Sequence, residues 1–509
     1  MSRFKEKKPS TDKEKNETKV LLVSFFNDEA YGLRSLHSTL IENGIEARML
    51  FFKVESMQFK GDHEASSKRD FTGGIRNASD KEIGLLVDFI LSNRFDVVAF
   101  SLVSSHHRLY KEIYKRIENI EGLSIVLGGW QPSLNPEECI RYSDYLCIGE
   151  GEVAFLELIR LLAKGSATDR VSNFWINDGG KIIKNPVRPL TPDISSFPLP
   201  LYDHKYSHII ENDEVIDHEP YFDNFRYGTF IGRGCPMQCT YCSNSYMANV
   251  VYPKSWSRIR CRSIEHVKTE LSTVKDKLKK VKSINFYDEV FMPDLEWIRN
   301  LFSWYKEEIG LPFYCFFFPG SCSEEKCEIL VSAGLSGVWL GVQSGSARVR
   351  KEVFKRSYTN QQIIDQAKIF NRHGVSVRYD FIFDNPFESF EESIESLLLM
   401  MELPQPFSLN LFSLKFFPNT EITKMALDAG LINKSNLDDN QTNDQDTYLI
   451  RQDVASPDNK FINHLAFYIS CLSKDSDLPE RKGGIYKLID DYRKNRDNTA
   501  IEDLIRPLV

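Results

Sequence analysis

The chain has 509 residues, of which 42% are hydrophobic, and a formal net charge of −8. This length predicts two domains and an appendage rather than a single core, and the absence of a basic excess argues against a nucleic-acid partner. The sequence contains no run of about 18 apolar residues and no signal-peptide core, so we expect a cytoplasmic protein with no membrane partner.

The first part of the chain alternates apolar runs with helical patterns. Residues 1–18 are rich in charge and predict a disordered tail. Residues 53–80 lack periodicity and predict a loop. Buried strands are predicted by the apolar runs at 19–25, 47–52, 96–102, 124–128 and 145–148. This β-α order predicts an α/β domain over 19–164, with the parallel sheet of the doubly wound (Rossmann-like) class.

A change of composition separates this region from the rest. The stretch NPVRPLTPDISSFPLPLYD is rich in proline, which fixes φ and removes hydrogen-bond donors, so residues 165–226 are predicted to be a linker.

Beyond the linker the alternation resumes. Apolar runs occur at 228–232, 282–287, 312–317, 337–341, 376–383 and 408–415. A helix is predicted over 264–280 by its apolar face, and another starts at a capping box of Thr359 and Gln362. Six β-α repeats predict a partial (β/α)6 TIM-like barrel over 227–430. The weaker pattern at 431–509 predicts a helical C-terminal extension.

Three cysteines directly follow the first predicted barrel strand. Cys235, Cys239 and Cys242 have C-x3-C-x2-C spacing in RGCPMQCTYCSNS, at the strand end where barrels place their active sites. Thiolates are the usual ligands of iron-sulfur clusters, and three of them leave one iron of a 4Fe-4S cluster open. The alternatives are buried structural thiols or zinc. Zinc usually takes a fourth ligand, and no nearby His or second CxxC supplies one.

With this motif, residues 227–430 resemble the core domain of the radical S-adenosylmethionine (radical SAM) superfamily. Four further segments resemble it in sequence order: NFYDEVF, GVWLGVQSGS, DFIFDNPFE and LFSLKFFPNTEI. The resemblance implies that the three cysteines hold a 4Fe-4S cluster, which cleaves S-adenosylmethionine to a 5'-deoxyadenosyl radical. It also implies an external electron donor such as flavodoxin or ferredoxin.

The same resemblance implies contacts to S-adenosylmethionine. Tyr241 is expected near the adenine, and Asp288 or Glu289 at the methionine amino group. Further cofactor contacts are expected from the fourth-strand and fifth-strand motifs, at Gln343, Ser344 and Glu388. Gln343 departs from the commoner glutamate of the family and removes a charge.

The first domain resembles the cobalamin-binding domain that precedes the radical core in a large subgroup of this superfamily. The resemblance implies that Ser101, Gly128 and Gly129 accommodate the nucleotide tail. The cobalt-ligating histidine of the D-x-H-x-x-G motif is missing, as is common in the subgroup. The pair His106 and His107 is expected to cap a helix or face solvent. The GEGE segment at 149–152 is expected to be a turn and helix start.

These resemblances imply a cobalamin-dependent methyltransferase that acts on an unactivated carbon of a small molecule. The alternatives are a cobalamin-associated cyclase or rearrangement enzyme, an RNA methylthiotransferase, and a non-catalytic cobalamin-binding protein. A degenerate domain kept for stability is a further alternative for the N-terminal half. Outside the triad we expect buried thiols, although Cys322 and Cys327 also permit part of an auxiliary cluster.

Overall fold

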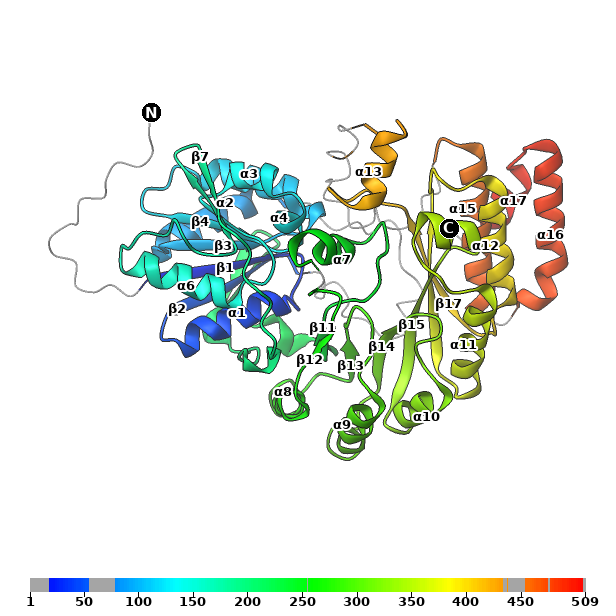
Figure 1. Ribbon diagram of the computed structural model, residues 1–509, viewed down its shortest axis with the longest axis horizontal. Helices are drawn as coiled ribbons and strands as arrows, with labels where there is room; N and C mark the ends of the chain where they lie inside the picture. The colour runs from blue at the N-terminus through cyan, green and yellow to red at the C-terminus, as the bar shows by residue number, and fades with distance from the viewer. Residues whose placement is uncertain are drawn as a thin grey trace.

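The computed structural model describes residues 18–54, 78–253, 255–433, 437, 454–474 and 477–506. The predicted tail at 1–18, apart from residue 18, and most of the predicted loop at 53–80 lie outside these residues. The described chain builds two large sheets that lie side by side, one from each half of the sequence, and a small two-stranded sheet (Figure 1). Within the described ranges, no helix is long and apolar enough to cross a membrane.

The first sheet contains nine strands. They are β1 Lys19–Phe25, β2 Glu46–Phe52, β3 Val97–Ser101, β4 Ser124–Gly128, β5 Tyr145–Cys147, β6 Phe174–Asp178, β7 Lys181–Lys184, β8 Ser207–Glu211 and β9 Glu214–Ile216. Their order is β7-β6-β5-β4-β3-β1-β2-β8-β9. The five predicted strands are parallel in the order β2-β1-β3-β4-β5, so the doubly wound prediction is confirmed.

Helices cover both faces of this sheet (Figure 1). Helices α1 (Tyr31–Glu42) and α6 (Glu152–Ala163) pack on one face, and α2 (Asp80–Asn93) and α3 (His107–Ile117) pack on the other. Short helices α4 (Trp130–Leu134) and α5 (Pro136–Cys139) follow β4. Because both faces are covered, the strands are continuous apolar runs, which is why the sequence pattern located them.

The proline-rich region differs from the predicted linker. Strands β6 and β7 extend one edge of the first sheet as antiparallel strands, and β8 and β9 extend the other edge. Only β8 is fully buried along its length. The other three strands, β6, β7 and β9, are short and partly exposed, and they contain no long apolar run. Strands at the edge of a sheet, such as β7 and β9, tolerate nearby prolines.

The second sheet has six strands, all parallel, in sequence order. They are β10 Arg226–Thr229, β13 Ser283–Phe286, β14 Phe313–Phe317, β15 Leu335–Gln343, β16 Ser376–Phe383 and β17 Ser408–Ser413. Outer helices are α8 Ile264–Lys277, α9 Leu295–Glu308, α10 Glu324–Ser332, α11 Asn360–Arg372 and α12 Phe390–Glu402. Helix α11 begins at the predicted capping box. The partial (β/α)6 barrel is therefore confirmed.

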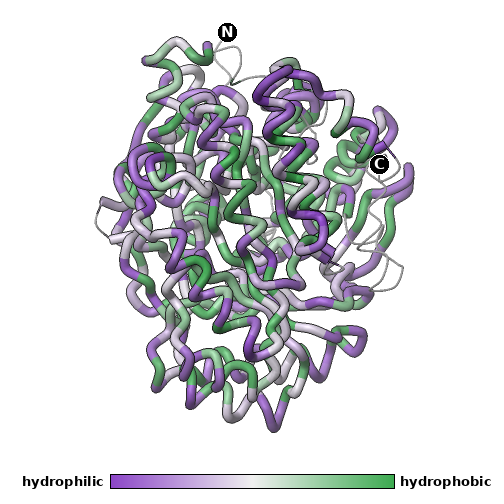
Figure 2. Tube along the Cα trace, turned by 90° about the vertical axis from the view of Figure 1, so that its right-hand side faces the viewer, coloured by the Kyte–Doolittle hydropathy of each residue, from purple (hydrophilic) through white to green (hydrophobic). Residues whose placement is uncertain are grey.

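The C-terminal helices lie outside this barrel. Helix α15 (Pro457–Lys474) packs on α12 and β17, and α16 (Leu478–Asn495) and α17 (Thr499–Ile505) pack on α15. Figure 2 views the molecule from this side, and hydrophobic and hydrophilic residues alternate along its helices. Such alternation is typical of amphipathic helices with one face on a core.

Candidate functional site

The three cysteines of the motif lie on one loop at the carboxyl end of β10. The loop follows β11 (Gly232–Arg233), which pairs with β12 (Arg260–Cys261), and it ends at α7 (Ser243–Tyr246). Gly234 starts the loop with φ +113°, and a Cβ there would lie 2.6 Å from the carbonyl oxygens of Trp256 and Arg258. Only glycine fits this close approach.

Cys235 and Cys239 are buried and Cys242 is half-buried. Burial, together with the other two sulfurs, raises the pKa of Cys235 to about 12. Burial also raises the pKa of Cys242, with Cys239 adding to it. The three sulfurs are thus close enough to interact, and a bound cation would favour the thiolate forms of Cys235 and Cys242.

The chemistry of the three donors fits an iron-sulfur cluster. Thiolates are the usual protein ligands of a 4Fe-4S cluster, and three of them leave one iron open. A structural zinc site usually takes four protein ligands.

Asp288 and Glu289 follow β13 and lie beside the cysteine loop. Asp288 is buried, and its carboxylate accepts the backbone N–H groups of Ile231 and Gly232 at 2.6–3.1 Å. Burial still raises its pKa to about 6. Both oxygens of Asp288 thus hold the strand that leads into the loop. Burial, together with the neighbouring Asp288, raises the pKa of the half-buried Glu289 to about 7. Glu289 is accordingly the better candidate for a ligand amino group.

Three of the predicted S-adenosylmethionine contacts gather at the ends of β15 and β16. The Ser344 hydroxyl donates to the Glu388 carboxyl at 3.0 Å. Burial raises the pKa of Glu388 to about 8. Gln343 is buried and adopts φ +72° at the end of β15. The register between β15 and β16 shifts at the same place, between Gly341 and Gln343.

Tyr241 lies between the second and third cysteines and packs beside β16 and β17. Its ring makes an edge contact with Phe354, with centroids 4.9 Å apart, and the Arg356 guanidinium lies 5.9 Å from its centroid. Its hydroxyl oxygen is buried without a hydrogen-bond partner. An unpaired buried hydroxyl is costly, so it favours a bound polar ligand here.

The predicted cobalamin contacts lie at the carboxyl ends of β3 and β4. Gly129 has φ +101°, and a Cβ there would lie 2.8 Å from the Leu102 carbonyl oxygen and 3.0 Å from the Ser101 hydroxyl. The Gly129 carbonyl accepts the Ser133 hydroxyl, which in turn accepts the Gly149 N–H. The loops after β3, β4 and β5 are therefore tied together without side chains at Gly128 and Gly129. The close approach of Leu102 and Ser101 thus requires glycine at position 129.

Of the two expectations for His106 and His107, solvent exposure is wrong, whereas His106 does occupy the N-cap position of α3, without a side-chain hydrogen bond to the helix. Both are buried, and burial lowers the pKa of each to about 4. His106 packs on the rings of Phe25 and Phe26. The dipeptide lies at the turn into α3, where the chain passes over the sheet end, so it faces the core rather than solvent.

The sequence did not indicate the contacts between the two halves. The GEGE segment is the predicted turn and helix start, since Gly149 has φ +79° and α6 begins at Glu152. In addition, Glu150 and Glu152 form ion pairs with Arg233 and Arg260, next to the cysteine loop. Residues so distant in sequence share no period or spacing that would predict their contact.

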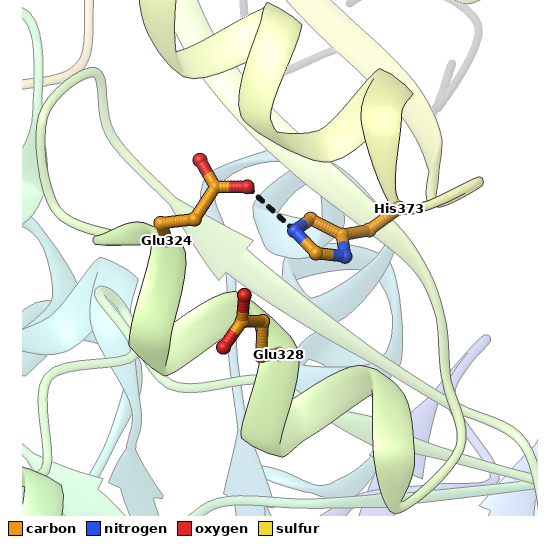
Figure 3. A group of neighbouring side chains, drawn as sticks. All are labelled: Glu324, Glu328 and His373. Atoms are coloured by element: carbon orange, nitrogen blue, oxygen red, sulfur yellow. Dashed lines mark hydrogen bonds and ion pairs between the residues drawn. The ribbon is translucent and has the colours of Figure 1, made fainter.

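A second group of metal-ligand types occurs on the outer helices. Glu324 and Glu328 on α10 and His373 after α11 have ligand atoms within 4.8 Å of one another. Figure 3 shows His373 facing Glu324, with 2.6 Å between Nε2 and Oε1. Glu324 also pairs with Arg372, and Glu328 is exposed. This arrangement is a surface ion-pair cluster, separate from the cysteine loop.

Two family profiles match the chain. Residues 229–400 match the Radical SAM superfamily, and residues 77–159 match the B12 binding domain. The chain therefore combines a radical SAM domain with a B12-binding domain. The radical SAM domain implies a 4Fe-4S cluster and S-adenosylmethionine, and the other domain implies cobalamin.

Individual proteins resemble long stretches of the chain. An uncharacterized methyltransferase of Pyrococcus horikoshii is 27% identical over 334 residues, which is 62% of this chain and 69% of the relative. The radical S-adenosylmethionine methyltransferase TsrM of Kitasatospora setae superposes with a TM-score of 0.61 at 17% identity, over 81% of this chain and 76% of TsrM. The cobalamin-dependent radical enzyme OxsB superposes with a TM-score of 0.64 at 16% identity, over 97% and 75%. At these identities the two structures establish the fold.

Proposed function

We propose that the chain is a cobalamin-dependent radical methyltransferase that acts on an unactivated carbon of a small molecule. The observation that carries the proposal is an aromatic contact between the two cofactor motifs. Trp130, next to Gly129, makes an edge contact with Trp256, with ring centroids 6.4 Å apart. The Trp256 carbonyl accepts the N–H of Cys235 at 3.3 Å. The methyltransferase names of the relatives in Pyrococcus horikoshii and Kitasatospora setae support the same reaction class.

Each part of the chain has a proposed task. The bound cofactors supply a 5'-deoxyadenosyl radical and a transferable methyl group. Residues 19–164 hold cobalamin, and the backbone of Ser101, Gly128 and Gly129 contacts the nucleotide tail of the cofactor. Residues 227–430 hold the cluster through the three cysteines.

The S-adenosylmethionine site is proposed at the mouth of the barrel. Glu289 accepts the methionine amino group, because its neighbour Asp288 is occupied by backbone N–H groups. Tyr241 and the pair Ser344–Glu388 contact the nucleoside. Packing of the two domains against each other keeps water away from the reacting groups.

Electrons for the cluster come from outside the chain in this proposal. A small acidic donor such as flavodoxin or ferredoxin is the partner that we expect, and dithionite replaces it in the assay below. We propose a small-molecule substrate and no nucleic acid.

The experiment uses anaerobically reconstituted protein with dithionite, S-adenosylmethionine, and hydroxocobalamin present or absent. A methyltransferase of this kind consumes S-adenosylmethionine in two ways, so we expect both 5'-deoxyadenosine and S-adenosylhomocysteine. The triple variant Cys235→Ala, Cys239→Ala and Cys242→Ala is expected to lose 5'-deoxyadenosine.

The outcomes separate the candidate functions. S-adenosylhomocysteine that forms only with cobalamin supports methyl transfer. Formation of 5'-deoxyadenosine alone, with cobalamin retained, favours the cyclase or rearrangement class. If the triple variant still forms both products, the assignment of radical chemistry to the three cysteines is refuted.

A further inference from the structure

Two carboxylates of the cobalamin-type domain neutralise two arginines of the barrel. Glu150 holds Arg260 through two contacts of 2.6 and 3.1 Å, and it approaches Arg233 at 3.4 Å. Glu152 holds Arg233 at 2.7 Å. All four side chains are at most 17% exposed. These ion pairs are therefore largely shielded from solvent and salt.

The two arginines need these carboxylates because of where they lie. Arg233 and Arg260 are directly opposite each other in the β11–β12 ribbon. Like charges at opposite positions of an antiparallel pair repel each other, and buried charges without partners are costly. The ribbon that leads into the cysteine loop thus depends on carboxylates from the other domain.

An aromatic contact runs beside the ion pairs. The Tyr252 hydroxyl accepts the Glu150 N–H at 2.8 Å, and a Cβ on Gly149 would lie 2.1 Å from that hydroxyl. Tyr252 stacks on Trp256 with centroids 5.8 Å apart and an interplanar angle of 11°. Trp256 in turn meets Trp130. We call Glu150, Glu152, Arg233, Arg260 and Tyr252 the domain seam.

The seam residues stand next to the cofactor motifs on both sides. Arg233 precedes Cys235 by two positions. Glu150 follows β5, and Gly129 follows the neighbouring parallel strand β4, so both lie at the carboxyl ends of these strands. A shift of the seam therefore moves the cysteine loop relative to the Gly128–Gly129 turn.

We propose that the domain seam consists of positioning residues that fix the cysteine loop at a set distance from the cobalamin-type domain. For the cobalamin part, the inference rests on the proposed function. Loss of the seam changes the geometry between the two cofactors, while the ligands of each cofactor remain in place.

The test compares the double variant Glu150→Gln, Glu152→Gln with the control Glu157→Gln. Glu157 lies on the same helix α6 and pairs at 2.7 Å with Arg188, outside the barrel. Hydrogen exchange is measured for residues 232–242 in the reconstituted proteins. We expect exchange at least about tenfold faster in the double variant and unchanged in the control.

A second readout addresses the cofactor geometry itself. Pulsed electron paramagnetic resonance measures the magnetic interaction between the reduced cluster and cob(II)alamin, which falls with the cube of their separation. We expect a weaker or broadened interaction in the double variant at unchanged iron and cobalamin content. A role in stability alone would lower the melting temperature without moving this signal.

The single variant Tyr252→Phe is the second test if the double variant does not fold. It removes the hydroxyl that holds the Glu150 N–H, and it is expected to accelerate exchange of the same residues. Exchange and magnetic interaction equal to those of the wild type would overturn the inference. If the wild type retains no cobalamin, the proposed function fails, and the exchange measurement still decides whether the seam holds the loop.

Discussion

The hydroxyl of Ser344 donates to the carboxyl of Glu388 over 3.0 Å, which joins the end of β15 to the loop after β16. Burial raises the pKa of Glu388 to about 8. The carboxyl is therefore mostly protonated at neutral pH, and it can donate a hydrogen bond as well as accept one. A neutral group at this place suits the uncharged nucleoside of S-adenosylmethionine.

This pKa predicts a pH-dependent stability. The folded state keeps a proton that the unfolded state releases, so the free energy of unfolding falls as pH rises from about 4.5 to about 8. We expect Glu388→Gln to be more stable than the wild type by about 1–3 kcal/mol near pH 8 and equal near pH 4. Urea unfolding across this pH range measures the difference. Identical pH slopes for both proteins would contradict the raised pKa.

The variant Asp288→Asn should loosen the strand that leads into the cysteine loop. Asparagine has one acceptor oxygen where the carboxylate receives the N–H groups of Ile231 and Gly232. Loss of a charge-assisted hydrogen bond costs about 1.5–3 kcal/mol. We expect a severalfold lower iron content after reconstitution and a lower melting temperature. The exposed carboxylate Asp80, which pairs with Arg116, provides the control Asp80→Asn. Equal iron content in both variants would refute this role of Asp288.

The sequence predicted those features that depend on local patterns. Buried parallel strands are continuous apolar runs, so β1 and β4 begin and end where the pattern predicted. The three cysteines lie within eight positions, so their spacing could be read without the fold, and the structure places them on one loop.

Contacts between residues that are far apart in the chain could not be predicted from the sequence. The ion pair between Glu150 and Arg260 joins residues 110 positions apart, and charged residues more often face solvent than each other. The strands in the proline-rich region were not predicted, for another reason. They are strands of three to five residues at the two margins of the sheet, too short for a clear pattern of side-chain polarity.

The turn at Gly129 should tolerate no side chain. In Gly129→Ala the new Cβ would meet the backbone N and O of Leu102 at 2.9 and 2.8 Å, in addition to the strain of a positive φ. Gly122 has a similar φ of +83° with nothing within 4 Å of a Cβ, so Gly122→Ala isolates that strain. We expect the control to lose about 1–2 kcal/mol and retain cobalamin. Gly129→Ala is expected to lose more stability and to release cobalamin on desalting. Equal retention by both variants would argue against the turn as a cobalamin contact.

Single cysteine variants should separate cluster ligands from buried thiols. Cys315 on β14 is fully buried in the barrel core, so Cys315→Ala is expected to cost about 1–3 kcal/mol of stability while four irons per chain remain. Replacement of Cys235, Cys239 or Cys242 by alanine leaves two sulfurs for the cluster, and we expect iron content and the absorbance near about 400 nm to fall severalfold. Cys322→Ala is expected to behave as Cys315→Ala does, since Cys322 and Cys327 lie buried against the same core. More than four irons per wild-type chain, reduced by Cys322→Ala, would instead show that these two thiols hold a second cluster.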